Sequence, residues 1–523
     1  MFTLDEIRHQ DELILGCAAN DILGLLPSRL SQKILTWVEN TPRAPALHGI
    51  NQQLNYAELG GAVSEAKVWL QQHGVRAGDR VMLVAENSIT LMCLFLALSE
   101  LDAIAAVINA RLSDREIDLI ALDCDPRIII FTSGDSKDAR VQADRLTAEQ
   151  FTMTFGLYAA TVAVACEPEV VFADPAQQVL AMIYTTGTTG TPKGVMLTHQ
   201  NLSFIAFISG RLRGIKPGDR VYSALPMSHV FGLSAVCSSV LFSGGCIHLV
   251  PRFDAAEALR AMAEDELVGF LGVPTMYALM IELLEQKPAW RAPQLRFMFS
   301  GGAPLDPNLK ARVESAFRLP LHNGYGLTES GPTISQARLY APLENCSVGY
   351  PLPGVDVKLL DKAGEKVETG EIGELWAKGP NIMKGYFRQP ELTAAVIKDG
   401  WFNTADLAFQ DTAGTINIAG RTKELIIRSG FNVYPPEVEA VLSSHPDVSL
   451  CAVIGRSTAG DEEIVAYIQP VEGKLLDVDA ILAFSRERLT GYKVPTQIVI
   501  KAQLPTAPSG KILKHQLMKD EAS

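Results

Sequence analysis

The chain has 523 residues, of which 47% are hydrophobic, and a formal net charge of −13. This length exceeds that of one compact domain and predicts two or three domains, and the apolar content excludes a largely disordered chain. The acidic balance disfavours a nucleic-acid partner and a polybasic attachment to membranes.

The N-terminus and the cysteines predict a cytoplasmic protein. The chain begins Met-Phe-Thr-Leu-Asp-Glu, with acidic residues where a signal peptide carries positive charge. Its 8 cysteines are scattered without a Cys-x-x-Cys pair, which is typical of buried thiols in a reducing compartment. The 9 histidines show no metal-ligand spacing. The first 27 residues carry no pattern that we can interpret.

Helical and strand segments alternate from about residue 30 to residue 350. Strands are predicted at 81–85, 105–108, 127–131 and 179–184, and a helix at 91–101. This alternation is typical of an α/β fold with parallel sheets.

A polar loop of unusual composition follows the strand at 179–183. Residues 184–196 read Tyr-Thr-Thr-Gly-Thr-Thr-Gly-Thr-Pro-Lys-Gly-Val-Met. Glycine lets backbone N–H groups approach an oxygen closely, threonine adds hydroxyl donors, and Lys193 adds a positive charge, so the loop predicts a socket for a polyphosphate. It is not a Walker A loop, because Pro192 stands where that pattern needs glycine before the lysine. The alternative is a flexible surface linker.

Residues 230–250 form an apolar stretch that could be taken for a membrane span, because no charged residue occurs between Arg220 and Arg252. Its serines and the pair Gly244-Gly245 favour a buried helix at about 232–243 followed by a buried strand at about 246–250. We therefore expect no integral membrane segment.

The character of the sequence changes after about residue 354. Short strands at 355–360, 373–378 and 415–418, with Gly and Asp turns, predict an antiparallel subdomain. The last hundred residues predict a separate α+β domain with helices at 435–444 and 478–489 and strands at 450–454, 464–468 and 497–500. We expect an N-terminal domain at 1–422 and a C-terminal domain at 423–523.

Five further segments carry polar residues in unusual places: 300–304, 323–329, 401–407, 420–424 and 508–511. The segment 323–329 is expected to follow a strand near 319–321. Each alone could be a turn. Together with the threonine loop, in this order and spacing, they resemble the acyl-adenylate-forming (AMP-binding) superfamily, and most of all an acyl-CoA synthetase. The resemblance covers about residues 30 to 518. It implies a large multi-sheet α/β N-terminal domain and a small mobile α+β C-terminal domain. It also implies two half-reactions, in which ATP activates a carboxylate to an acyl-adenylate and a thiol then displaces AMP.

The resemblance implies a role for each motif in binding ATP and Mg²⁺. The threonine loop would hold the β- and γ-phosphates through Thr185, Thr186, Gly187, Thr188, Thr189, Gly190 and Lys193. Thr328 would contact the α-phosphate, and Glu329 would help to hold Mg²⁺, a cation that prefers carboxylate and phosphate oxygens. Tyr325 would stack on adenine, Asp406 would accept the ribose hydroxyls, and Arg421 would reach the ribose or a phosphate. The rest of the nucleotide pocket would be formed by Gly301, Gly302, Ala303, Asn323 and Gly326.

Four other residues receive roles from the same resemblance. Lys511 would bridge the carboxylate and the α-phosphate in the first half-reaction, although a solvated surface lysine is the alternative. Lys423 would be the hinge of the C-terminal domain, and Gly430 would line the pantetheine tunnel for coenzyme A. His229 would gate the site near the substrate carboxylate, and a hydrogen-bonded core histidine is the competing interpretation.

The acyl pocket is expected between residues 229–234, 300–304 and 324–334. Acetate-specific relatives carry Trp at the position of Gly326, so the glycine favours larger acids: a medium or long fatty acid, or an aryl acid such as a hydroxycinnamate. A second carboxylate on the substrate is disfavoured, because 229–240 and 324–334 contain no arginine or lysine.

Three functions remain open on the sequence. The first is a free-standing acyl-CoA ligase, the second an enzyme that loads a carrier protein, and the third an inactive nucleotide-binding regulatory protein. Consumption of CoA separates the first two, and failure to release pyrophosphate with any acid would favour the third. Either a monomer or a homodimer is compatible with the sequence.

Overall fold

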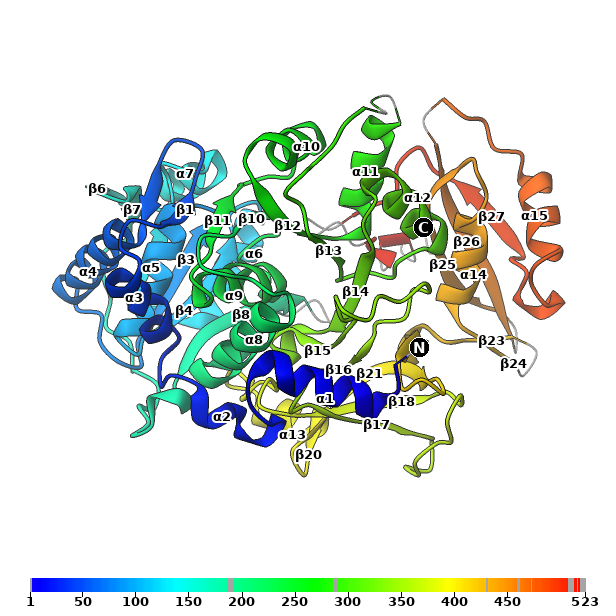
Figure 1. The fold of residues 1–523 in the computed structure, drawn as a ribbon, viewed down its shortest axis with the longest axis horizontal. Coiled ribbons are helices and arrows are strands. Elements are labelled where there is room, and N and C mark those ends of the chain that lie inside the picture. The colour runs from blue at the N-terminus through cyan, green and yellow to red at the C-terminus, as the bar shows by residue number, and fades with distance from the viewer. Residues whose placement is uncertain are drawn as a thin grey trace.

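The computed structural model describes residues 2–186, 192–285, 287, 289–428, 431–458, 461–471, 473–506, 512–514 and 516–517, and of Thr186 the backbone only. Two large sheets and a central group of helices build the N-terminal part, and a smaller unit drawn in orange to red lies beside α11 (Pro274–Leu284) and α12 (Pro307–Phe317) (Figure 1).

The first large sheet has eight strands in the order β19-β9-β8-β4-β3-β5-β7-β6. Its parallel centre consists of β3 (Arg80–Ala85), β4 (Ile104–Asn109), β5 (Ile128–Phe131) and β8 (Val179–Thr186). Both faces of these strands are covered, which explains why they are apolar throughout instead of alternating. The antiparallel edges are β6 (Glu149–Met153), β7 (Gly156–Ala160), β9 (Pro192–Thr198) and β19 (Gly385–Tyr386). The predicted parallel α/β sheet is confirmed.

The second large sheet has nine strands in the order β16-β15-β14-β13-β12-β10-β11-β1-β2. Its strands are β1 (Pro45–His48), β2 (Gln53–Asn55), β10 (Arg220–Ser223), β11 (Cys246–Leu249), β12 (Leu267–Gly272), β13 (Phe297–Ser300), β14 (Leu321–Gly326), β15 (Thr333–Gln336) and β16 (Tyr350–Pro351). The carboxyl ends of β13 and β14 carry two of the predicted motifs.

Helices cover these sheets, and several of them begin at a residue whose side chain caps the first turn. The helix α5 (Ile89–Glu100), for example, begins at Ser88, whose hydroxyl accepts from the Leu91 N–H, and it is buried nearly throughout. The other helices of the N-terminal part are α3 (Leu30–Asn40), α4 (Tyr56–Gln72), α6 (Asp114–Cys124), α7 (Lys137–Arg145), α8 (His199–Leu212), α9 (Ser239–Phe242), α10 (Ala255–Glu264) and α13 (Pro390–Val396).

The apolar stretch at 230–250 folds as a buried helical segment and a buried strand, as expected. The helical part is a π-helix, η3 (Phe231–Ser238), continued by α9 and followed by β11. A π-helix is uncommon and occurs frequently at functional sites. In the part of the chain that the structure describes, no helix is long and apolar enough to cross a membrane.

The antiparallel subdomain is confirmed as a five-stranded sheet. It contains β17 (Asp356–Leu360), β18 (Gly373–Lys378), β20 (Ile397–Lys398), β21 (Trp401–Gln410) and β22 (Ile416–Arg421). The motif at 401–407 lies inside β21, and Arg421 is the last residue of β22.

The C-terminal unit has a hydrophobic core of its own, which includes Ile426, Val438, Leu442, Ile464 and Ile481. Its elements are the ribbon β23 (Ile426–Arg428) and β24 (Phe431–Val433), the sheet β25 (Val448–Ser457), β26 (Glu462–Pro470) and β27 (Gln497–Ile500), and the helices α14 (Pro435–Ser443) and α15 (Val478–Arg486). The predicted helices and strands of this region are all present. A separate core supports an independent domain, and the boundary at 422/423 stays a prediction.

One motif lies differently from the expectation. Residues 323–326 were expected to follow a strand near 319–321, but the strand β14 begins at Leu321 and includes them. The reason is that β14 continues beyond its parallel partner β13 and pairs antiparallel with β15, with Tyr325 opposite Ser335. The motif is therefore held by a strand ladder.

The first 27 residues form a docked helical segment that the sequence analysis did not interpret. It comprises α1 (Leu4–Leu15), η1 (Ala19–Asp21) and α2 (Ile22–Leu25). A capping box of Thr3 and Glu6 begins α1. Asp11 of this helix forms a buried ion pair with Arg338, with 2.9 Å between Oδ2 and Nη2.

Candidate active site

The ends of the threonine loop lie on two adjacent antiparallel strands. Thr185 at the end of β8 is paired with Lys193 near the start of β9. The residues on either side of the loop are therefore held next to each other by the antiparallel pairing of β8 with β9. Gly187, Thr188, Thr189 and Gly190 lie outside the described residues, as does the side chain of Thr186.

Tyr386 connects this hairpin to Glu329. The strand β19 pairs with β9, so that Tyr386 lies opposite Val195. The Nζ atom of Lys193 is 5.6 Å from the centroid of the Tyr386 ring. The Tyr386 hydroxyl donates a hydrogen bond of 2.8 Å to Oε1 of Glu329. Two residues that are predicted to bind phosphate and metal are thus joined through a tyrosine that the sequence analysis did not identify.

The turn that carries Thr328 and Glu329 is fixed by two asparagines. The turn is the short helix η4 (Thr328–Ser330). The Asn381 side chain donates to the carbonyl oxygens of Ser330 and Thr333, at 3.1 and 2.8 Å. The Asn201 side chain on α8 donates in turn to the carbonyls on either side of Asn381, those of Pro380 and Ile382. Helix α8 therefore positions the turn through a chain of hydrogen bonds to buried backbone groups, which would otherwise be costly to leave unpaired.

Asp406, Tyr325 and Arg421 form a second cluster, which connects β14 with β21 and β22. Asp406 in β21 is buried and lies opposite Arg421 of β22, with 3.1 Å between Arg421 Nε and Asp406 Oδ1. The Tyr325 hydroxyl donates to Asp406 Oδ2 at 2.5 Å. Burial and the negative charge of Asp406 raise the pKa of Tyr325 well above its usual value, so the phenol stays protonated and can donate.

The strand β14 and the turn η4 bring the two clusters together. Tyr325 and Glu329 are four residues apart in the sequence, and each anchors one cluster. Asn323 lies just before them, and its side chain donates to the Cys346 carbonyl at 2.9 Å. A single continuous segment thus carries both Glu329 and Tyr325, the residue that contacts Asp406.

The residues predicted around the acyl pocket also converge. His229 is half-buried in the loop before η3, and this loop is held by Asn87, whose side chain accepts from the Met227 N–H at 2.8 Å. His229 Nδ1 accepts from the Phe231 N–H at 3.3 Å, so the ring has a local partner. A Cβ atom on Gly301 would be 3.1 Å from the Phe231 ring and 3.5 Å from the Gly324 carbonyl. The segments at 229–234, 300–304 and 324–334 therefore meet, as predicted. Gly302, with φ of +78°, and Ala303 continue this turn.

The presence of glycine at position 326 is explained by a close approach of the backbone, which the sequence pattern did not reveal. A Cβ atom at this position would lie 1.6 Å from the Pro332 carbonyl oxygen. No side chain fits there in this backbone, so the glycine does not by itself show that the pocket is open to large acids.

The hinge candidate Lys423 is exposed in the short helix η5 (Thr422–Glu424). It lines a hollow of about 180 Å³ together with Glu424, Ile426, Val453 and Lys514. Lys514 pairs with Glu424 at 3.1 Å and with Glu439 at 2.7 Å, which connects Lys514 to both η5 and α14. Lys511 and Gly430 lie outside the described residues.

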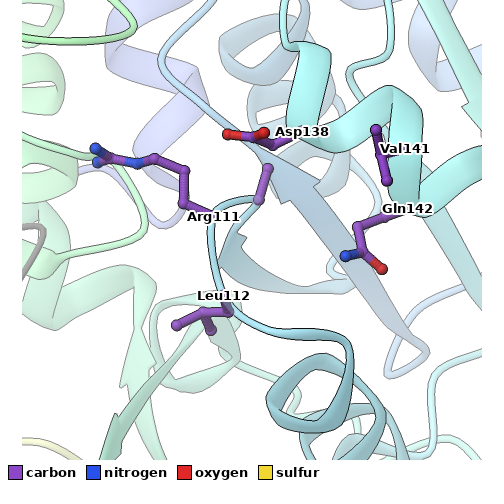
Figure 2. A pocket seen from close by; sticks show the side chains of 6 residues that line it. Arg111, Leu112, Asp138, Val141 and Gln142 are labelled. Atoms are coloured by element: carbon purple, nitrogen blue, oxygen red, sulfur yellow. The ribbon is translucent and has the colours of Figure 1, made fainter.

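A larger hollow of about 330 Å³ contains none of the predicted site residues. Ala110, Arg111, Leu112, Asp138, Val141 and Gln142 line it, at the end of β4 and along α7 (Figure 2). Its charges are paired within the protein: Arg252 contacts Asp138 at 2.5 Å and Glu86 at 2.9 Å, and Glu86 lies 3.6 Å from Arg111. This hollow is therefore not the predicted nucleotide site.

Comparison with known proteins identifies the family. The model of the AMP-binding enzyme matches residues 34–387, and the model of the AMP-binding enzyme C-terminal domain matches residues 437–511. The chain belongs to the AMP-binding enzyme family. This confirms the predicted superfamily, the fold class and the prediction of an enzyme of the AMP-forming acid–thiol ligase type.

The similar members of the AMP-binding family include ligases for different acids. A feruloyl-CoA synthase from Amycolatopsis sp is 34% identical, over 91% of this chain and 96% of that protein. A long-chain-fatty-acid–CoA ligase from Bacillus subtilis (strain 168) is 28% identical, over 95% of each. The structure of o-succinylbenzoate coenzyme A synthetase from Bacillus subtilis in complex with ATP and magnesium ion is 30% identical, with a TM-score of 0.78 over 93% of this chain and 99% of that one.

Within this AMP-binding fold, the individual roles of the site residues stay predictions. The geometry unites Lys193, Glu329, Tyr325, Asp406 and Arg421 around β14 and η4. Sequence reasoning missed Tyr386, Asn381 and Asn201, because none of them lies in a conspicuous polar motif. Only the pairing of β19 with β9 and the hydrogen bonds to buried carbonyls reveal them.

Proposed function

We propose that this enzyme uses ATP to activate a carboxylic acid and then transfers the acyl group to coenzyme A. The observation that carries the proposal is the segment from Tyr325 to Glu329, which joins the Lys193–Tyr386–Glu329 cluster to the Tyr325–Asp406–Arg421 cluster. One cluster suits a polyphosphate with its metal, and the other suits a ribose. Tyr325 and Glu329, which anchor the two clusters, are only four residues apart in the sequence. Such closeness suits two clusters that bind the ribose and the phosphates of one nucleotide.

In the first half-reaction a carboxylate oxygen attacks the α-phosphorus, and the bond from that phosphorus to the bridging oxygen of pyrophosphate breaks. Both reactants are anionic, so the site must supply positive charge and hold them in position. Lys193 is suited to the leaving pyrophosphate, and Thr328 to the α-phosphate. We assign Lys511 to the reacting centre. In the second half-reaction the sulfur of coenzyme A attacks the acyl carbon, and AMP leaves.

Mg²⁺ is expected to enter with ATP and to contact Glu329. Among the described residues no group of three His, Cys, Asp or Glu side chains could hold a metal ion by itself. A half-buried carboxylate oriented by Tyr386 next to the phosphate loop suits a cation that is shared with substrate phosphates. Bound Mg²⁺ would neutralise charge on the phosphates. Glu329 and Tyr386 would set its position.

Buried hydroxyls support an acid that carries oxygen atoms, such as an aryl acid of the hydroxycinnamate type. The Oγ atoms of Ser234, Ser300 and Ser335 are buried without a hydrogen-bond partner in the described protein. They belong to η3, β13 and β15, the elements around the predicted acyl pocket. A saturated fatty chain would leave them unpaired, which is unfavourable. The similarity to a feruloyl-CoA synthase supports the same class, and a medium or long fatty acid is the second candidate because of the similarity to a fatty-acid ligase.

Two points about the enzyme's partners and motion belong to the proposal. Coenzyme A is the proposed thiol, as in the names of the similar ligases, and a carrier protein is the alternative. The C-terminal domain is proposed to begin at Lys423 and to reorient between the half-reactions, with Gly430 lining the pantetheine path.

The test is a panel of acids with ATP, Mg²⁺ and coenzyme A. The panel holds fatty acids from C2 to C18, benzoates and hydroxycinnamates, and both pyrophosphate and thioester are measured. We expect both products in a one-to-one ratio with at least one aryl acid. Pyrophosphate release without use of coenzyme A would favour the carrier-protein enzyme. If none of the acids causes release of pyrophosphate, the result would favour an inactive nucleotide-binding protein.

A further inference from the structure

Arg213 is a buried cation between the π-helix η3 and the strand β13. It directly follows α8, and only 3% of its surface is exposed. Its Nη1 atom donates to the carbonyl oxygen of Ala235 in η3. Its Cζ atom lies 5.1 Å from the centroid of the Phe299 ring in β13. The guanidinium group is therefore enclosed by two elements of the predicted acyl pocket.

The charge of Arg213 has no counterpart in the described protein. Burial lowers the pKa of its guanidinium to about 9, and no acidic side chain acts on it in the opposite direction. Its Nε–H is also buried without a hydrogen-bond acceptor. A buried cation without a partner is strongly unfavourable, whereas one that meets a carboxylate is not.

The other two buried arginines of the described chain show the usual arrangement. Arg80 pairs with Glu169 at 2.6 Å and with Asp125 at 3.2 Å. Arg338 pairs with Asp11 at 2.9 Å and donates to backbone carbonyls as well. Arg213 is thus the one buried arginine of the described residues whose anionic partner is missing from the protein itself.

The position of Arg213 relates it to the deep end of the acyl pocket. Phe231 at the start of η3 contacts Gly301, which marks the pocket near the carboxyl end of β13. Phe299 and Gly301 are two residues apart and therefore face the same side of the strand. Arg213 lies over the Phe299 ring. Phe299 itself precedes Gly301 by two residues, which is about 7 Å along the strand towards the interior of the sheet.

We propose that Arg213 binds a second carboxylate on the substrate, so that the preferred acid is a dicarboxylic acid. The distal carboxylate would accept from Nε–H and pair with the guanidinium charge. The Oγ atom of Ser234, adjacent in sequence to Ala235, offers a further hydrogen bond to it. The inference deepens the proposed acid–CoA ligase function and rests on it. The expectation against a second carboxylate considered only residues 229–240 and 324–334, and Arg213 comes from neither.

The first test compares matched acids on the wild-type enzyme. The pairs are hexanoate with hexanedioate, cinnamate with 4-carboxycinnamate, and 3-phenylpropanoate with 3-(4-carboxyphenyl)propanoate. We measure kcat/KM for pyrophosphate release with ATP, Mg²⁺ and coenzyme A. At least one dicarboxylate should exceed its monocarboxylate counterpart by about tenfold or more, as expected for a buried charge-assisted pair. The proposal is overturned if every monocarboxylate matches or exceeds its dicarboxylate.

The second test uses Arg213→Met and Arg213→Lys, with Arg211→Met as the control. Arg211 is an exposed arginine two residues away. Arg213→Met should lower kcat/KM for the dicarboxylate by about tenfold to a thousandfold and change the monocarboxylate by less than about threefold. Arg213→Lys should keep part of the preference for the dicarboxylate over the monocarboxylate. The control Arg211→Met should keep the whole preference.

The two tests separate this inference from the function on which it rests. A purely structural role for Arg213 would lower the rates for both acids of a pair equally, and that result would contradict the proposal. If thermal unfolding shows that Arg213→Met does not fold, the proposal is judged by two other results. These are the kcat/KM values of Arg213→Lys and the comparison of matched acids on the wild-type enzyme. If no acid at all releases pyrophosphate, the proposed function fails and the inference fails with it.

Discussion

Among single residues, Tyr386 has a role that a conservative change can test. Its hydroxyl donates to Glu329, and its ring lies beside Lys193. We predict that Tyr386→Phe keeps the fold but lowers kcat/KM for Mg-ATP by about tenfold, because a hydrogen bond to a carboxylate is lost. The measurement is ATP–pyrophosphate exchange as a function of the concentrations of ATP and Mg²⁺.

Tyr158→Phe is the matched control for this change. The Tyr158 hydroxyl is buried without a hydrogen-bond partner in the described protein, so its loss should leave the exchange unchanged. Equal kinetics of Tyr386→Phe and the wild type would show that the hydroxyl does not orient Glu329.

Lys511 is assigned to the reacting centre of the first half-reaction only. We predict that Lys511→Ala abolishes acid-dependent ATP–pyrophosphate exchange, while a preformed acyl-adenylate still reacts with coenzyme A. The reason is that charge moves between carboxylate and α-phosphate only in the adenylation step. Normal exchange in the variant would refute the assignment.

At the scale of elements, helix α1 is held to the body by a buried ion pair. Asp11 and Arg338 are both almost fully buried, and Tyr340 also donates to Asp11 at 2.8 Å. We predict that Asp11→Ala lowers the free energy of unfolding by about 3–5 kcal/mol, because the arginine charge is left buried without its carboxylate. Urea unfolding and limited proteolysis of the N-terminal segment measure the effect.

The exposed pair of Asp5 and Arg8 on the same helix provides the control. These side chains are 3.4 Å apart and largely solvated. Asp5→Ala should therefore change stability by less than about 1 kcal/mol. Similar losses for both variants would indicate that the helix end, and not the buried pair, determines stability.

The strands β1 and β11 carry a stacked histidine pair that predicts pH-dependent stability. The rings of His48 and His248 are 4.2 Å apart, and burial, followed by the neighbouring His48, lowers the pKa of His248 to about 4. The unfolded chain then binds more protons than the folded one between about pH 4 and 6.5, so stability is full above this window and falls as the pH falls through it. We expect this histidine to account for about 2 kcal/mol between pH 7 and pH 5.

The test for this pair compares thermal unfolding at pH 7 and pH 5 in the wild type and in His248→Gln. The variant should lose less stability than the wild type over this interval. His9→Gln, at an exposed position, should behave like the wild type. An unchanged pH dependence in His248→Gln would contradict the prediction.

At the scale of the whole molecule, the proposed hinge lies at the predicted boundary between the two domains. Lys423 is exposed in η5, which directly follows Arg421 of the Tyr325–Asp406–Arg421 cluster. We predict that Lys423→Pro keeps acid-dependent pyrophosphate exchange but slows thioester formation by about tenfold or more, because proline restricts the backbone rotation that a hinge requires. Lys423→Ala, which leaves the backbone free, should keep both activities. Equal loss of both half-reactions in Lys423→Pro would argue against a hinge at this residue.

The sequence by itself determined the family, the fold class and most of the elements. Short apolar runs such as 179–183 are typical of buried strands, and a loop rich in Thr and Gly next to one offers the backbone and hydroxyl donors that suit an anion. These are local patterns, so they can be read without knowing the fold. The motifs at 323–329 and 401–407 were recognised in the same way, although the first of them was placed after a strand instead of within one.

Only the tertiary structure decided which residues meet. Tyr386 reaches Glu329 because β19 pairs with β9, and Asp11 reaches Arg338 across 327 positions of the chain. Gly326 is explained by the Pro332 carbonyl, and Arg213, which follows α8, reaches the Ala235 carbonyl of η3. Each of these depends on contacts between distant segments, where the desolvation of a polar or charged group sets the energy. Whether a polar or charged group is desolvated depends on how distant segments pack, so local sequence patterns cannot reveal it.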